Sequence, residues 1–152
     1  MQLTDFLSPD RIAIGVNAHS KKRVLETLSE LIAHDQPGRA GEIFEALLSR
    51  ERLGGTGIGS GVAIPHGRLK DTDHTTGALV RLREGVDFDA IDEQPVDLLF
   101  ALVVPEEATE DHLRILAMLA SLFQDPEFRA RLRACQAPDD VYHLLQQWQP
   151  AA

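Results

Sequence analysis

The chain has 152 residues, of which 43% are hydrophobic and 26% charged, so it is long enough for one domain with a single core and too apolar for disorder. Its formal net charge of −9 disfavours nucleic acid and anionic lipid as partners, and its lone cysteine, Cys135, excludes an intrachain disulfide and a cysteine-based metal cluster. Because the N-terminus shows no secretion signal and no apolar stretch approaches membrane-spanning length, we expect a cytoplasmic protein with no membrane insertion and no nucleic-acid partner.

The first third of the chain predicts one strand and two helices. Residues 11–16 have the apolar character of a short strand. Ser20 follows as the N-cap of a helix that runs to about His34, with apolar residues at the spacing of one helical face. After a proline and glycine break, a second helix is predicted over about residues 39–52. It ends at a glycine-rich run over residues 53–67, which therefore begins at a helix C-terminus.

The rest of the chain predicts two strands and three helices. Residues 77–83 alternate as a strand does, and residues 96–104 form the long apolar run typical of a central strand buried on both faces. Thr109 is expected to cap a helix over residues 110–124. The residues expected on the core side of that helix are Leu113, Leu116, Leu119, Leu122 and Phe123. The prolines expected to start two further helices, the first of them capped by Asp125, are Pro126 and Pro138.

This order of elements predicts the fold class. Helices bracket the strands along the chain, which favours a layered α/β domain over a helical bundle or a β-barrel. We expect a single-domain layered mixed β-sheet flanked by helices, covering residues 1–152. The order of the strands within the sheet does not follow from these patterns.

The glycine-rich run LGGTGIGSGVAIPHG holds six of the eleven glycines and ends in a histidine that follows a proline, His66. Glycines permit positive φ angles and close approach to backbone N–H groups, while Pro65 gives His66 a defined direction. Two nucleotide-binding motifs are excluded, because the phosphate loop requires lysine and the dinucleotide fingerprint requires glycine where Ser60 stands. We interpret the run as a loop that presents an imidazole.

Two further residues make His66 a candidate acceptor of a phosphoryl group. Arg50 precedes the run in a locally basic segment. His112 lies in the first turn of a predicted helix, where N–H groups and the helix dipole favour an anion and disfavour a protonated imidazole. A neutral His112 could donate to a phosphoryl oxygen, Arg50 could supply charge, and loop N–H groups could complete the site. The spacing of histidines and carboxylates suggests no metal site.

A strongly acidic segment suggests other functions. Residues 84–111 carry ten carboxylates and neither lysine nor arginine. Such a segment is either a solvated acidic rim or a surface on which a partner protein docks, and the second interpretation predicts a non-catalytic interaction module. A further hypothesis is a metal-dependent hydrolase that uses His66 and His112, which predicts stoichiometric metal in the purified protein.

Three stretches of the chain carry a resemblance to a known family. TGIGSGVAIPHGRL, FDAIDEQPVDLLFALVVPEE and HLRILAMLA resemble the enzyme IIA domain of the fructose and mannitol class (type 2) of the bacterial phosphotransferase system, and most of all its nitrogen-regulatory branch. The resemblance covers about residues 4–148. Ser60 departs from the asparagine expected in that branch and keeps a polar side chain.

The resemblance implies that His66 accepts a phosphoryl group, through Nε2 and without a cofactor, from an HPr-like phosphocarrier protein. Arg50 and His112 match the family's supporting arginine and second histidine. In the regulatory branch, phosphorylation controls binding to other proteins, including potassium-transport and sensor-kinase components. The alternative within the family is the IIA component of a fructose-like sugar uptake system, which passes the phosphoryl group to a IIB domain. The loop residues implied as support for the phosphate are Thr56, Gly57 and Gly59.

Overall fold

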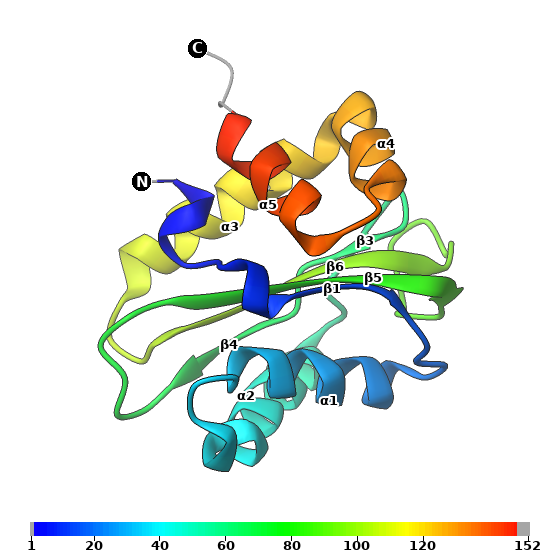
Figure 1. Ribbon diagram of the computed structural model, residues 1–152. Coiled ribbons are helices and arrows are strands. Elements are labelled where there is room, and N and C mark those ends of the chain that lie inside the picture. The colour runs from blue at the N-terminus through cyan, green and yellow to red at the C-terminus, as the bar shows by residue number, and fades with distance from the viewer. Residues whose placement is uncertain (1, 149–152) are drawn as a thin grey trace.

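The computed structural model of the chain describes residues 2–148. Figure 1 shows a mixed β-sheet of six strands between a pair of helices on one face and three helices on the other. The expected fold class, a layered mixed β-sheet flanked by helices, is confirmed. The strands are β1 (Ile12–Val16), β2 (Gly57–Gly59), β3 (Val62–Ala63), β4 (His66–Leu69), β5 (Thr76–Val86) and β6 (Val96–Pro105). The helices are α1 (Lys21–Ile32), α2 (Ala40–Leu53), α3 (Thr109–Gln124), α4 (Pro126–Ala134) and α5 (Pro138–Gln147), with 3-10 turns at Leu3–Asp5, Pro9–Arg11 and Pro37–Arg39.

The strand β6 is the centre of the sheet. The strand order is β1-β5-β6-β3-β2, and β4 lies off this path, paired with β6. β6 runs antiparallel to β5 and parallel to β3 and β4. β3 and β4 follow one another along the same side of β6, with Val62 opposite Leu98 and His66 opposite Leu102. The end of the glycine-rich run is therefore held against the central strand.

The apolar run of β6 is buried on both faces, as predicted. Since side chains alternate across a strand, this one strand contributes to two hydrophobic cores. One core lies under α1 and α2, and the other under α3, α4 and α5 (Figure 1). The β6 side chains in the first core include Leu99, Ala101 and Val103, and those in the second include Leu98, Phe100 and Leu102.

The helix starts agree with the predictions at α1 and differ at α3. Ser20 caps α1 by accepting a hydrogen bond from the N–H of Arg23 at 3.1 Å. The predicted cap at Thr109 is wrong, because α3 already begins at Thr109 and Ala108 occupies the N-cap position. The carbonyl of Ala108 accepts the first helical hydrogen bond, from the N–H of His112 at 3.1 Å. The chain enters this helix without a side-chain cap.

The core face of α3 agrees with the prediction at Leu116, Leu119, Leu122 and Phe123 and differs at Leu113. Leu119 is fully buried, but Leu113 is 62% exposed, and Ile115 is buried instead. At 100° per residue, Leu113 lies about 120° around the helix from Leu119, well off the face that packs on the sheet. By the same geometry, His112 lies only about 20° from Leu119, and its side chain is buried.

The glycine-rich run forms three short strands rather than a continuous loop. β2 and β3 pair antiparallel, and they are joined by a turn in which Gly59, Ser60 and Gly61 all have positive φ angles. The N–H of Ser60 donates to a carboxylate oxygen of Asp92 at 2.9 Å, which ties this turn to the segment before β6. Strands of two to four residues are too short to show an alternating pattern, so the sequence did not reveal them.

Candidate functional site

His66 is the first residue of β4 and lies opposite Leu102 of β6. Its ring nitrogen Nδ1 is 2.8 Å from the carbonyl oxygen of Ile64. A carbonyl oxygen only accepts hydrogen bonds, so Nδ1 carries the proton and donates. In the neutral imidazole, Nε2 is then the nitrogen with the free lone pair. The local backbone thereby selects one tautomer.

The surroundings of His66 favour this neutral form. Burial lowers the pKa of His66 below its ordinary value, and the positive charge of Arg50 lowers it further. The hydrogen bond to Ile64 and the negative charge of Glu51 raise the pKa of His66 but do not outweigh burial. An unprotonated imidazole at neutral pH is the form required of a nitrogen nucleophile.

His112 comes from α3 and lies against His66. The two ring centroids are 5.1 Å apart with a tilt of 55° between the planes. His112 is 7% exposed, and its Nδ1 is buried without a hydrogen-bond partner among the described residues. Burial lowers the pKa of His112, and the nearby His66, Arg68 and Arg50 lower it further. Two neutral imidazoles therefore share the site.

Arg50 reaches the site because α2 packs very close to β4. A side chain at Gly67 would place its Cβ 2.8 Å from the carbonyl oxygen of Ala46, so this approach requires glycine. Arg50 lies one helical turn after Ala46, and its charge acts on the ring of His66 at the start of β4. Its guanidinium donates to the carbonyl of Gly54 at 2.8 Å, which uses one of its five N–H donors.

The three loop residues expected to support a phosphate do not all lie near His66. Thr56 donates both its N–H and its hydroxyl to the carboxylate of Glu51, so both donors are already engaged. Gly57 pairs with Ala63, and Gly59 pairs with Val62. Val62 and His66 pair with residues of β6 that are four positions apart. Gly59, beside Val62, therefore lies about 13 Å from His66 along the strand direction. The structure brings together His66, His112 and Arg50, and it leaves Gly59 outside that group.

Two charged residues near the site were missed at the level of sequence. Arg68 is exposed and stands two positions after His66, hence on the same face of β4, and its charge lowers the pKa of His112. Glu51 is buried next to Arg50. The sequence could have placed Arg68 beside His66, because residues two positions apart in a strand share a face, but only if β4 is first recognised as a strand. The burial of Glu51 has no signal in its neighbouring residues.

The acidic segment 84–111 is divided between opposite ends of the sheet. The ten residues of β6 separate its two parts by about 30 Å. Several of its carboxylates also have intramolecular partners: Asp89 pairs with Lys21 at 2.9 Å, and Asp97 pairs with Arg133 at 2.9 Å. The segment therefore does not form one continuous acidic surface.

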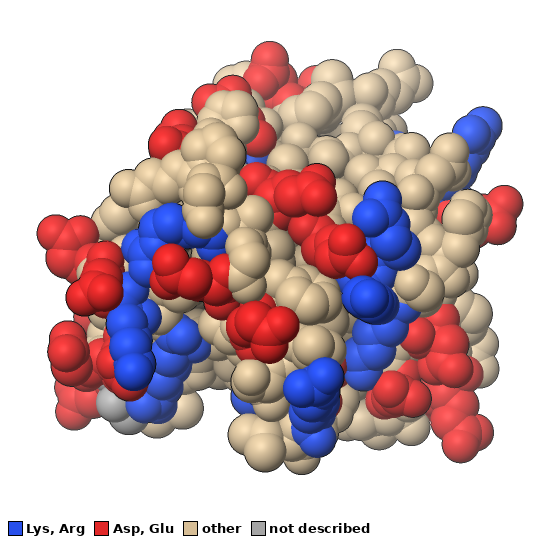
Figure 2. All heavy atoms as spheres, turned by 90° about the horizontal axis from the view of Figure 1, so that it is seen from below, with Lys and Arg blue, Asp and Glu red and all other residues tan. Residues whose placement is uncertain are grey.

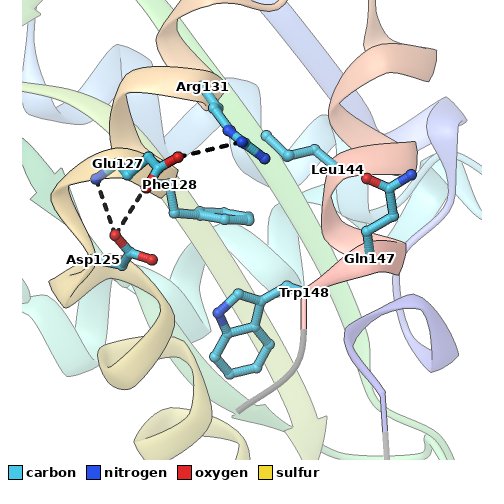
Figure 3. A pocket seen from close by; sticks show the side chains of 7 residues that line it. All are labelled: Asp125, Glu127, Phe128, Arg131, Leu144, Gln147 and Trp148. Carbon is cyan, nitrogen blue, oxygen red and sulfur yellow. Dashed lines mark hydrogen bonds and ion pairs between the residues drawn. The ribbon is translucent and has the colours of Figure 1, made fainter. Parts of the chain in front are cut away.

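Other features of the surface lie apart from His66. Figure 2, which views the molecule from the side of α1 and α2, shows basic and acidic side chains interspersed on that face. Figure 3 shows a pocket between α4 and α5, where Asp125 caps α4, as predicted, by accepting from the N–H groups of Glu127 and Phe128 at 3.0 and 3.3 Å. None of the lining residues of this pocket belongs to the site around His66. They are Asp125, Glu127, Phe128, Arg131, Leu144, Gln147 and Trp148.

Within residues 2–148, no three histidine, cysteine or acidic side chains gather in an arrangement able to hold a metal ion. The hydrolase hypothesis therefore has no ligand set in this part of the chain. None of the helices in the same range combines the length and apolar character needed to cross a bilayer.

Comparison with known proteins gives consistent matches over almost the whole chain. Residues 5–148 match the family described as phosphoenolpyruvate-dependent sugar phosphotransferase system, EIIA 2. The nitrogen regulatory protein of Klebsiella oxytoca is 44% identical over 146 residues, which cover 95% of this chain and 90% of that protein. The fructose-specific EIIABC component of the Bacillus subtilis PTS system is 29% identical over 150 residues, covering 97% of this chain and 23% of that protein.

A solved structure agrees with these matches. The crystal structure of nitrogen regulatory protein IIA-Ntr from Neisseria meningitidis is similar with a TM-score of 0.88 and 40% sequence identity, covering 93% of this chain and 97% of that one. The resemblance that we inferred from the glycine-rich run and the acidic stretch is thereby confirmed. The chain belongs to the EIIA type 2 family of the phosphoenolpyruvate-dependent sugar phosphotransferase system.

Proposed function

We propose that the protein is a phosphoryl carrier that accepts a phosphoryl group on Nε2 of His66 from the phosphohistidine of an HPr-like phosphocarrier protein. The observation that carries this proposal is the 2.8 Å contact between Nδ1 of His66 and the carbonyl oxygen of Ile64. It supports a neutral imidazole with a lone pair on Nε2. Membership of the EIIA type 2 family and the proximity of His112 support the same reaction.

The proposed transfer is a single displacement at phosphorus. The Nε2 lone pair forms a bond to phosphorus while the P–N bond of the donor phosphohistidine breaks, and the electron pair of that bond returns to the donor imidazole. Negative charge stays on the phosphoryl oxygens during the transfer, so catalysis consists of positioning and charge stabilisation. The donors that we assign to those oxygens are the guanidinium of Arg50 and the one N–H of a neutral His112.

The output that we propose is regulation of other proteins. Phosphorylation of His66 adds about two negative charges to the surface around it, which is enough to create or abolish a protein interface. The relatives named nitrogen regulatory protein favour this output. By analogy with that branch, the targets are potassium-transport or sensor-kinase components that bind one phosphorylation state. A second candidate, transfer to a IIB domain for uptake of a fructose-like sugar, is favoured by the Bacillus subtilis relative.

Intact-mass measurement after incubation with a phosphorylated HPr-like carrier tests the acceptor. We expect the wild-type protein to gain one phosphoryl group and His66→Ala to gain none. Arg50→Ala should be phosphorylated about a hundredfold more slowly, the effect of losing one donor to a charged transition state. No gain of mass in the wild type, or an equal gain in His66→Ala, would overturn the proposal.

A capture experiment separates the two outputs. The phosphorylated and unphosphorylated forms are each immobilised and offered the sensor-kinase and potassium-transport components, and in parallel a IIB domain of the fructose class. Regulation predicts that a target binds one of the two forms and that His66→Ala always behaves as the unphosphorylated form. Rapid transfer of the phosphoryl group to the IIB domain, without selective target binding, would favour the sugar-uptake role.

A further inference from the structure

Glu51, in the last turn of α2, is a carboxylate with almost no access to water. Its side chain is 2% exposed, and a buried charge is costly unless it is paired and hydrogen-bonded. One carboxylate oxygen receives Nζ of Lys21 and the N–H of Thr56, both at 2.9 Å, and the other receives the hydroxyl of Thr56. Three donors from α1 and the glycine-rich run therefore converge on this side chain.

Lys21 places a positive charge beside this carboxylate. Burial lowers the pKa of Lys21, but its hydrogen bonds to Glu51 and Asp89 and the charges of these residues raise the pKa above its ordinary value. Lys21 also lies over the ring of Phe88, 4.9 Å from the centroid. With Lys21 on one of its oxygens, the carboxylate of Glu51 still accepts hydrogen bonds from both donors of Thr56.

From Thr56 the hydrogen bonds continue to the ring of His66. The carbonyl oxygen of Thr56 accepts the N–H of Ile64 at 3.0 Å. The carbonyl oxygen of Ile64 in turn accepts Nδ1–H of His66 at 2.8 Å. Pro65, between Ile64 and His66, has a fixed φ angle and reduces the freedom of this last step. The chain of contacts runs without a break from Lys21 to the imidazole.

We propose that Glu51 and Thr56 are positioning residues for His66, because this chain of hydrogen bonds holds the Ile64 carbonyl where it captures the Nδ1 proton. The inference rests on the proposed role of His66 as phosphoryl acceptor through Nε2. The coupling is one of position: the N–H and the C=O of Thr56 belong to successive peptide units, so displacement of Thr56 displaces Ile64. Without the Ile64 acceptor, the ring of His66 exchanges between two tautomers, and in one of them Nε2 is protonated and cannot attack.

Nitrogen-15 NMR of the histidine rings measures the tautomer directly, at a pH where His66 is neutral and without any phosphoryl donor. We expect His66 of the wild type to be protonated at Nδ1. In Thr56→Val, which loses the hydroxyl and keeps the shape, and in Glu51→Gln, which loses the charge, we expect a mixture of tautomers. The rate of phosphorylation by the carrier should fall about three- to tenfold in both variants, the factor that corresponds to one net hydrogen bond.

Two matched variants separate positioning from a general loss of stability. Thr56→Ser restores the hydroxyl and should restore the single tautomer. Asp97→Asn weakens the ion pair between Asp97 and Arg133, which lies outside this chain of contacts, and should lower stability while leaving the His66 ring unchanged. If Glu51→Gln does not fold, Thr56→Val and Thr56→Ser carry the comparison by themselves.

The outcomes distinguish this inference from the proposed function. Folded Thr56→Val with an unchanged Nδ1–H tautomer and an unchanged phosphorylation rate would overturn the positioning role. A wild type that shows the single tautomer, lost in Thr56→Val, but that accepts no phosphoryl group would support the positioning of the ring and overturn phosphoryl acceptance.

Discussion

At the scale of single residues, the surroundings of His66 oppose protonation of the ring and favour a bound anion. Burial and the charge of Arg50 lower the pKa of His66, and the same influences together with Arg68 lower the pKa of His112. Cationic groups that repel a proton attract a group carrying about two negative charges. We infer that one set of charges prepares the nucleophile and stabilises its phosphorylated form.

Arg68→Gln should raise the pKa of His112, because it removes one of the positive charges that oppose protonation of that ring. The pKa of His66 should change less, since the charge next to that ring is the one on Arg50. Arg50→Gln is the matched variant and should raise the pKa of both histidines. NMR titration of the two rings measures these shifts, and an equal response of both rings to Arg68→Gln would contradict the arrangement.

The same shifts determine how stability depends on pH. The pKa values of His66 and His112 in the folded protein lie below the unfolded value of about 6.5. The free energy of unfolding therefore has its full value, as far as these two histidines affect it, above that pH. Their contribution is lost as the pH falls from there through the folded pKa values. In Arg68→Gln the pKa of His112 moves back toward the unfolded value, so less of the unfolding free energy should be lost over this range than in the wild type.

At the scale of elements, the site depends on how closely α2 packs on β4. Gly67 faces the backbone of Ala46, and Arg50 lies one turn farther along α2. On the other side, α3 places His112 against His66. His66, on the sheet, thus lies beside Arg50 from one helical layer and His112 from the other.

Gly67→Ala should therefore destabilise the protein and also weaken the site. The added Cβ would lie 2.8 Å from a backbone oxygen that cannot rotate away, so α2 has to shift, at a cost of about 1–3 kcal/mol. Chemical denaturation measures the loss, and phosphorylation by the carrier should slow as Arg50 moves. Gly41→Ala is the control on the same helix: its Cβ has open space, and it should stabilise by up to about 1 kcal/mol. Equal effects of the two substitutions would refute the close packing.

At the scale of the whole molecule, two cores share one strand. β6 contributes side chains to both, so neither helical layer can lose its packing without disturbing the strand that supports the other. We therefore expect the protein to unfold as a single cooperative unit.

Leu47→Ala tests this cooperativity. Leu47 is fully buried in the core under α1 and α2, and its truncation should cost about 2–5 kcal/mol. Trp148, the only tryptophan, packs against the opposite core and reports it by fluorescence. We expect the denaturation midpoints from Trp148 fluorescence and from circular dichroism to fall together. A tryptophan transition that stays at the wild-type midpoint would mean that the two layers unfold independently.

Much of the fold and part of the site could be predicted from local patterns. The central strand, the five helices and the α/β class follow from hydrophobic spacing and from caps such as Ser20 and Asp125. The exposed Leu113 was misplaced because which helix face packs on the sheet depends on the partner surface. The strands β2, β3 and β4 were missed because their hydrogen bonds are made with β6, far along the sequence, or within segments of two to four residues.

The sequence by itself determined the family and made His66 the candidate acceptor, because a glycine-rich run ending in Pro65 and His66 is a local and specific motif. The tertiary structure alone decided how the side chain of that residue is held. It selected the Nδ1–H tautomer through Ile64, engaged Thr56 with Glu51, and kept Gly59 away from His66. These outcomes depend on burial and on contacts between elements, and neither is encoded in any single stretch of the chain.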